Sequence, residues 1–443
     1  MKGHGMGRQG EGRGSANGFR GRVAEGGMLS QFLATLLATV MALGLLSLLA
    51  CSDSPTQPGP APEPITELPR ALTASEAELL DAGNRFGFDL LAELAPKHAH
   101  ENLFFSPLSA SMALGMTLNG ADGETYAQMR DMLGFEGLDQ EEINQAYATL
   151  LELLQGLDPQ VTVEIANSVW YREGVGVDAG FLQRIRTSFD AEADGVDFSD
   201  PATLDRINGW VNEKTRGTIP TLLDQVPAGL VMFLANAVYF NGEWTDAFDP
   251  QNTTTGSFTR ADGSTVDADF MRKERTEVGF REVEGHQLVE LPYGGQAYAM
   301  TVVLPAQGTA ATDLAAGLDA ETWASWTDGL PTREVALHLP KFELDWVRRL
   351  NEDLQGLGMQ DAFDAGAADF RRMVPGGGVW VDFVLQKSYV RVDEVGTEAS
   401  AATGVAVVES APPLVRADRP FVFAIRERLS GSVLFLGVVD DPS

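Results

Sequence analysis

Residues 392–404 join a strand-like start to a run of small side chains, and this combination limits how the chain can fold. The stretch reads Val-Asp-Glu-Val-Gly-Thr-Glu-Ala-Ser-Ala-Ala-Thr-Gly. From residue 397 onward it has no large apolar side chain, no aromatic ring and a single charge. Such a segment buries too little apolar surface to hold itself against the protein, so we expect it to be exposed.

The same segment also has the alternation of a strand, because successive side chains in a strand point to opposite faces. One face carries Thr397, Ala399, Ala401 and Thr403, and the other carries Glu398, Ser400, Ala402 and Gly404. The first face is small enough to be buried without a clash, and the only charge lies on the second. A loop that can become a central strand predicts a protein with two states.

Further blocks lie before and after this segment, over about residues 86–439. They are 102–109 (NLFFSPLS), 207–212 (INGWVN) with 217–219 (GTI), 236–244 (NAVYFNGEW), 291–293 (LPY), 339–342 (LPKF) and 419–423 (RPFVF). Each block alone is weak, but in this order and at these distances they resemble the inhibitory serpins. In that family residues 392–404 correspond to the hinge of a reactive loop that inserts into the protein's own sheet.

The resemblance implies an α+β fold with three mixed sheets, eight to nine helices and an exposed reactive-centre loop. It implies irreversible suicide inhibition of a serine or cysteine protease, which cleaves the loop and is trapped when the loop inserts into the main sheet. The first rival is a non-inhibitory serpin that acts as a carrier, chaperone or structural protein, but such members usually have a hinge broken by bulky or charged residues. The second rival is an enzyme, and no G-x-S-x-G, P-loop or H-E-x-x-H motif supports it.

The resemblance also assigns roles to single residues. The hinge residues are Glu394, Gly396, Thr397, Glu398, Ala399, Ser400, Ala401 and Ala402. Ser106, Ser109 and Asn208 match a polar cluster beneath the opening sheet, called the shutter, and Asn236 and Trp244 match the top of that sheet, where insertion starts. The family commonly has His-Lys where this chain has Gln386-Lys387. Glutamine does not titrate near neutral pH, which argues against a pH-sensitive shutter.

Residues 405–416 read VAVVESAPPLVR, an extended segment that suits a protease cleft because proteases bind their substrates as strands. Counting back from Pro420 with the family spacing places the scissile bond at Glu409–Ser410, whereas counting forward from Gly396 gives Ser410–Ala411. We favour Glu409, because the Ser-Ala-Pro-Pro that follows matches the common family pattern. Val408 is a third candidate and would favour elastase-like targets.

The N-terminus carries an apolar run at 30–50 that follows five basic residues and ends in Leu-Leu-Ala-Cys at 48–51. This pattern resembles the lipobox of bacterial lipoproteins and predicts a signal peptide at 1–50 with Cys51 lipidated. We therefore expect an exported protein, anchored to a membrane in the periplasm or at the cell surface, or extracellular. The alternative is a spanning helix, since about 20 apolar residues cross a bilayer. The start of the chain is either Met1 or Met28. A start at Met28 would leave no basic residue before the apolar run.

Residues 51–70 are rich in proline and predict a semi-extended tether, which leaves 71–443 as one large domain. Cys51 is the only cysteine, so this domain has no disulfide and packing alone holds it. The formal net charge of −31 excludes nucleic acid as a partner, because nucleic-acid binding needs a basic face. His98 and His100 have no further ligand nearby, so no metal or cofactor is predicted, and we expect a monomer.

Local signals place helices early and strands late, which predicts the α+β class. Helices are expected from the capping box at 73–76 to about residue 95, from Ser106-Pro107, from Asp139 and over 203–216. Strands are expected at 161–171, 232–240, 286–293, 298–304, 333–344, 381–392, 421–426 and 432–439.

Overall fold

The structure is a computed structural model that describes residues 63–227, 229–396 and 411–443. The predicted signal peptide, Cys51, most of the tether, the hinge from Thr397 to Ala402 and the candidates Val408, Glu409 and Ser410 lie outside these ranges. Within them, none of the helices is both long enough and apolar enough to cross a membrane.

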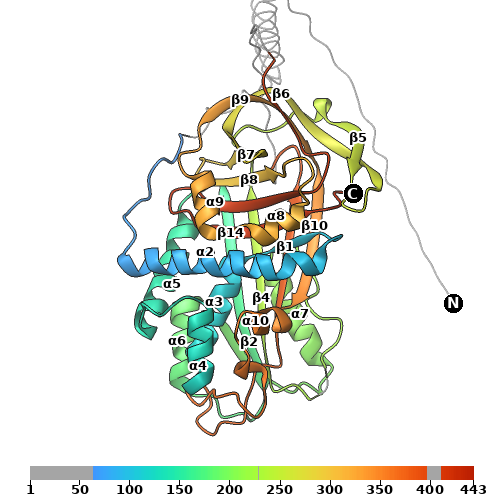
Figure 1. Cartoon of the computed structure of the whole chain (residues 1–443). Coiled ribbons are helices and arrows are strands. Elements are labelled where there is room, and N and C mark those ends of the chain that lie inside the picture. Colours follow the sequence, from blue (N-terminus) through green and yellow to red (C-terminus); the bar gives the residue numbers. More distant parts are fainter. Residues whose placement is uncertain (1–62, 228, 397–410) are drawn as a thin grey trace, which may run out of the picture. The chain divides into compact units, whose positions relative to one another are not determined.

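The described part of the chain contains nine α-helices and fourteen strands (Figure 1). The helices are α2 (Ala74–Leu94), α3 (Pro107–Leu118), α4 (Gly123–Met132), α5 (Gln140–Gly156), α6 (Ala179–Phe189), α7 (Ala202–Lys214), α8 (Ala311–Gly317), α9 (Ala320–Thr327) and α10 (Asn351–Gly356). The strands are β1 (Leu103–Phe105), β2 (Val161–Arg172), β3 (Glu192–Val196), β4 (Met232–Gly242), β5 (Thr254–Thr259), β6 (Thr265–Val283), β7 (His286–Tyr293), β8 (Tyr298–Leu304), β9 (Thr332–Pro340), β10 (Phe342–Arg349), β11 (Phe383–Val392), β12 (Leu414–Arg416), β13 (Phe421–Glu427) and β14 (Val433–Val439).

Helix starts follow the predicted capping signals. Thr73 and Glu76 form the capping box that opens α2, and Asp139 forms a second one with Glu142 at α5. At α3 the hydroxyl of Ser106 accepts a hydrogen bond from the backbone N–H of Ser109. Because each cap satisfies backbone N–H groups that have no partner within the helix, these starts are encoded locally.

Over the residues that the structure describes, the strands form two hydrogen-bonded sheets, where three were expected. The smaller sheet has the order β10-β11-β4-β2-β3, and the larger runs β1-β14-β13-β8-β7-β6-β9-β12, with β5 paired to β6. The 19-residue β6 joins the two parts of the larger sheet, because it pairs with β5 and β9 along one stretch and with β7 along another. Its register with β9 shifts between Lys273 and Thr276, and its pairing with β7 begins at Gly279.

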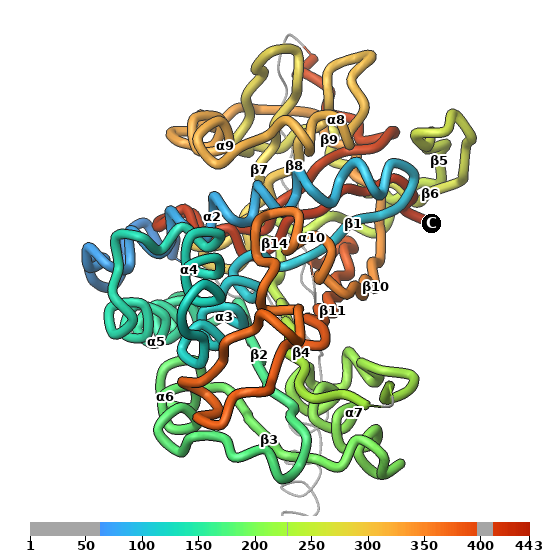
Figure 2. The backbone as a smooth tube through the Cα atoms, turned by 60° about the horizontal axis from the view of Figure 1, so that its bottom comes forward, coloured from blue at the N-terminus to red at the C-terminus, as the bar shows by residue number. Residues whose placement is uncertain are grey.

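Two helices lie on opposite faces of the smaller sheet (Figure 2). All twelve residues of α3 are buried, and this helix contacts β14 of the larger sheet as well as β2 and β4 of the smaller. On the other face α7 packs Ile207, Trp210 and Val211 against β2 and β4. The smaller sheet is therefore covered on both sides, as its nearly continuous apolar strand β4 predicts.

The expected strand at 333–344 is wrong, because the chain changes sheet within it. β9 ends at Pro340 in the larger sheet, and β10 starts at Phe342 in the smaller. Pro340 has no N–H to donate to a ladder, which suits the end of a strand. Alternate burial continues into β10, so the sequence pattern does not reveal the break.

The packed part of the chain begins before the boundary that was expected at residue 70. The backbone N–H of Ile65 donates to the carbonyl of Gly295 at 2.7 Å. Arg70 forms two hydrogen bonds with the buried carboxylate of Glu76, at 2.6 and 2.7 Å. These bonds, with one from Thr149, lower the pKa of Glu76 to about 2.

Candidate functional site

The two central strands of the smaller sheet are paired for only part of their length. β11 runs parallel to β4, and their register extends from Phe383 opposite Phe233 to Ser388 opposite Val238. Beyond that point β11 stays paired with β10 as far as Val392, and β4 stays paired with β2 to the end of the strand. The central pair therefore parts at the end of the sheet where β11 enters the hinge.

The hinge is held at this end by Trp244, which follows β4. The backbone N–H of Trp244 donates to the carbonyl of Val395 at 3.0 Å, and its indole N–H donates to the carbonyl of Asp393 at 2.9 Å. The indole stacks on the ring of Tyr293, with centroids 4.4 Å apart and an angle of 11° between the planes. Trp244 thus fixes the start of the hinge through two hydrogen bonds while its own position is set by packing.

Gly396 is the last described residue before the loop, and no other residue type fits its place. Its φ of +100° is a conformation that L side chains rarely adopt. A Cβ atom there would lie 2.4 Å from the backbone nitrogen of Trp244. The glycine predicted from the sequence is therefore required by the close approach of hinge and strand.

Glu394 forms a second attachment, on the side of the larger sheet. Its carboxylate accepts hydrogen bonds from Lys341 at 2.8 Å and from the hydroxyl of Thr253 at 2.7 Å. Its backbone carbonyl accepts the N–H of Phe248 at 2.7 Å. Burial alone would raise the pKa of Glu394, but the bonds from Lys341 and Thr253 outweigh it and hold that pKa below its ordinary value.

A buried polar cluster lies under the paired part of the central strands. The side-chain oxygen of Gln386 accepts the N–H of Ser106 at 3.1 Å, and its amide N–H donates to the carbonyl of Ser106 and to Asn236 Oδ1, both at 3.0 Å. The Nδ2 of Asn236 donates to the hydroxyl of Ser109 and, at 2.7 Å, to Asn167 Oδ1. These side chains link α3 to β11, β4 and β2 across the place where the sheet would have to open.

Asn167 is a member of this cluster that sequence reasoning missed. It lies on β2 opposite Asn236 and is 1% exposed. A signal was present, because Asn167 is polar within the inward-facing series Val163, Ile165, Val169. Recognising it required knowing that β2 and β4 are neighbours.

Two of the expected placements are wrong. Asn208 does not lie with Ser106 and Ser109: it is on α7, where its Oδ1 accepts the backbone N–H groups of Leu222 and Leu223 at 2.8 and 3.0 Å. This bonding fixes the connection after α7 on the other face of the sheet. Asn236 is not at the top of the sheet with Trp244, because it lies in the middle of β4, which continues to Gly242, and it belongs to the Gln386 cluster.

Lys387 points to the face opposite that of Gln386, as neighbours in a strand do. Its Nζ donates to the carbonyl of Thr221 at 3.0 Å and lies 3.3 Å from Asp345. After the loop, Ala411 is exposed, and the carbonyl of Pro413 accepts the N–H of Ala336 at 2.8 Å. The C-terminal end of the loop is therefore anchored to β9.

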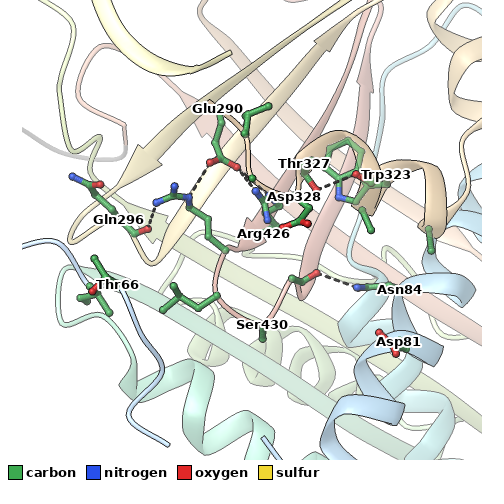
Figure 3. A pocket seen from close by; sticks show the side chains of 18 residues that line it. Thr66, Asp81, Asn84, Glu290, Gln296, Trp323, Thr327, Asp328, Arg426 and Ser430 are labelled. Atoms are coloured by element: carbon green, nitrogen blue, oxygen red, sulfur yellow. Dashed lines mark hydrogen bonds and ion pairs between the residues drawn. The ribbon is translucent and has the colours of Figure 1, made fainter. Parts of the chain in front are cut away.

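A cavity of about 620 Å³ lies elsewhere, between α2, α9 and the end of β13 (Figure 3). Its wall carries Glu290, which accepts hydrogen bonds from Arg426 and from Arg428, the latter at 2.9 Å. Arg428 also donates to the carbonyl of Gln296 at 2.8 Å. The cavity shares no lining residue with the hinge or with the Gln386 cluster.

Comparisons with known proteins agree with this geometry. The model of the family described as serpin (serine protease inhibitor) matches residues 81–442. The chain is 34% identical to Iripin-2 of Ixodes ricinus over 82% of this chain and 94% of that protein, and 32% identical to glia-derived nexin of Mus musculus over the same shares.

Solved structures with the same fold include the thermophilic serpin tengpin in its native state, with a TM-score of 0.77, 30% identity, and coverage of 86% of this chain and 97% of that one. Human thyroxine-binding globulin in complex with its hormone also has a TM-score of 0.77, at 26% identity, over 84% of this chain and 100% of that one. The chain therefore belongs to the serpin family of serine protease inhibitors.

Proposed function

We propose that this serpin inhibits a serine or cysteine protease by offering residues 405–411 for cleavage and then inserting the freed segment between β4 and β11. The observation that carries the proposal is the parting of these two strands beyond Ser388 and Val238, next to the hinge. The hinge leaves β11 at this end, and the sequence continues from it into small residues.

The chemistry begins when the protease's nucleophile attacks the carbonyl carbon of the residue before the scissile bond. The peptide bond breaks, the new amine leaves with a proton, and the N-terminal part remains joined to the protease as an ester or thioester. The part after the bond stays where it is, because β12 is paired with β9 from Leu414 to Arg416. Only the hinge side is free to move, and it carries the acylated protease with it.

The register of insertion follows from the turn at the hinge. Asp393 and Gly396 form an antiparallel bridge, and continuing that register sets Thr397 opposite Val392 and Glu398 opposite Arg391. Val392 is buried, whereas the side chain of Arg391 is 59% exposed. The small face of the loop would thus enter the core, and the charge of Glu398 would meet that of Arg391. The inserted strand would gain antiparallel ladders on both sides, and these stabilise the cleaved form.

The experiment is incubation with a panel of serine and cysteine proteases, followed by denaturing electrophoresis and mass spectrometry of the C-terminal fragment. We expect a complex that survives denaturation and a fragment that begins at Ser410, which identifies Glu409 as the residue before the bond. A fragment beginning at Glu409 or Ala411 would point to Val408 or Ser410 instead. Cleavage without any stable complex would contradict inhibition.

We further propose that the protein is exported and held at a membrane by a lipid on Cys51, and that it acts there as a monomer. The support is the Leu-Leu-Ala-Cys sequence at 48–51 and the proline-rich stretch that follows it. A tether of this composition behaves as a semi-extended spacer. It would keep the reactive loop accessible to proteases arriving from solution.

The alternative function is that of a non-inhibitory carrier, and the cavity in Figure 3 is the observation that favours it. Its volume of about 620 Å³ lies within the usual range for small-molecule sites. The test is displacement of a fluorescent apolar anion such as anilinonaphthalene sulfonate from the intact protein. If the protein is a carrier, the dye binds in this cavity and Arg428→Ala weakens that binding. The protein would then inhibit none of the proteases in the panel.

A further inference from the structure

Leu414 is an apolar side chain whose exposure the fold does not explain. It is one of two large hydrophobic side chains that are about half exposed in the described residues, at 49%, and the other is Val347 on β10, at 52%. Leu414 begins β12, directly after the two prolines that end the reactive loop. It lines a cleft of about 510 Å³ whose other walls are the β6–β7 turn and the residues that follow β8 and β12.

This cleft lies within reach of any protease that attacks the loop. Leu414 lies four positions after Ser410, and four residues span at most about 14 Å. A protease of roughly 230 residues has a radius of gyration of about 17 Å, so its surface extends beyond the cleft when its active site holds the bond. The hydrogen bond from the N–H of Ala336 to the carbonyl of Pro413 fixes the C-terminal end of the loop, next to the cleft, before the protease binds.

The charges around the cleft are divided between two walls. On one side Arg416 and Arg419 both turn towards Asp418, at 3.0 and 3.7 Å, so their charges are partly compensated. On the other side the β6–β7 turn presents the exposed Glu284, and Glu282 lies near it with a single amide contact at 3.3 Å. The cleft therefore offers one exposed apolar side chain, Leu414, and acidic groups along one rim.

We propose that this cleft is a second docking surface for the target protease, which inserts a surface loop with an apolar side chain flanked by lysine or arginine. The proposal rests on the function proposed above, and it adds a contact outside the scissile bond. The partner is a serine protease that cleaves after Glu409, because that bond lies within reach of the cleft. Lysine or arginine on its docking loop, outside its specificity pocket, would complement the acidic rim.

The cleft acts on the first encounter and not on the final complex. On insertion the hinge side of the loop leaves with the protease, whereas β12 and the β6–β7 turn stay in the larger sheet. Contacts with Leu414 and Glu284 are then broken. They raise the rate of attack on the loop and leave unchanged the fraction of attacks that end in a trapped protease.

The test uses the full chain and a glutamate-specific serine endopeptidase. The rate of loop cleavage or complex formation is measured for wild type, Leu414→Ser, Glu284→Asn and the double variant. Asparagine suits position 284 because the residue has φ +53°, which asparagine tolerates well. Matched controls are Val347→Ser, an equally exposed apolar residue on β10, and Glu136→Gln, an exposed acid on the α4–α5 connection.

We expect the double variant to react about five- to tenfold more slowly at low salt, with each single variant in between and both controls unchanged. The rate for wild type should also fall more steeply with added salt than that for Glu284→Asn. Cleavage at unchanged rates in all variants overturns the docking surface alone. Cleavage without a stable complex overturns inhibition alone, and no cleavage within 405–411 overturns both.

Discussion

Ser388 of β11 and Val238 of β4 are the last paired residues between the two central strands. β11 continues for four residues beyond Ser388 and ends at Val392. Trp244 holds the start of the hinge that follows, through the carbonyls of Asp393 and Val395. The sheet is thus closed over the Gln386 cluster and parted beside the segment that would enter it. Opening it further requires that the cluster's hydrogen bonds rearrange.

Gly396→Ala should destabilise the intact protein by more than about 2 kcal/mol. The new Cβ would meet the backbone of Trp244, in addition to the strain of a positive φ. Gly308→Ala is the matched control: its φ is +86° and nothing lies within 4 Å, so only the backbone strain of about 1–2 kcal/mol applies. Urea unfolding measures both. Equal losses for the two variants would show that the approach to Trp244 does not constrain the hinge.

Lys341→Met should lower the stability of the intact form by about 1 kcal/mol at neutral pH, and by less in acid. The folded pKa of Glu394 lies below that of the unfolded chain, so its contribution is complete above the ordinary glutamate pKa and is lost as the pH falls through the folded value. Lys214→Met is the control. Lys214 is about as exposed as Lys341, but its partner Glu192 is more exposed than Glu394, so this variant should lose less stability. A loss that is the same at acidic and neutral pH would contradict this role of Glu394.

Gln386→Leu should cost roughly 2–4 kcal/mol, because it leaves the buried N–H of Ser106 and the Oδ1 of Asn236 without their partner. Gln183→Leu, on the exposed face of α6, should change stability by less than about 0.5 kcal/mol. The midpoints of urea unfolding decide the matter. A cost for Gln386→Leu as small as that of the control would mean that the cluster does not hold the strands.

Cys51→Ser should move the protein from the membrane fraction to the soluble fraction of the producing cell. In the proposed anchor the lipid is attached to the thiol of Cys51, and the serine variant could not form that thioether. Membrane fractionation followed by immunoblotting measures the distribution. Equal retention of wild type and variant would indicate a membrane-spanning helix at 30–50 in place of a lipid anchor.

Local signals in the sequence predicted the elements whose causes are local. The capping boxes of α2 and α5 and the limits of β7 and β8 follow from side chains next to them in the chain. The 19-residue β6 was missed, because its middle is a run of charged residues, Arg272 to Arg275, which reads as a solvated loop. Its strand conformation depends on pairing with β9.

The candidate site could be predicted only as far as the family resemblance reached. Ser106, Ser109 and Gln386 share one hydrogen-bonded cluster, whereas Asn208 bonds to the chain after α7. The polarity of an asparagine on a helix does not reveal which buried groups it will bond, so the sequence alone does not separate these positions. The role of Lys341 was also missed, because it depends on the crossing of β9 into β10 beside Glu394.

The central claim is that the loop enters the smaller sheet once it is cut, and the melting temperature of the cleaved protein tests this most directly. Wild type cleaved within 405–411 should melt at least about 10 °C above the intact form, because a new central strand adds several kcal/mol. Thr397→Arg should remove most of this gain, since the register puts residue 397 beside the buried Val392. Glu398→Arg, beside the exposed Arg391, should retain most of it. A cleaved wild-type protein that melts at or below the intact one would contradict the account.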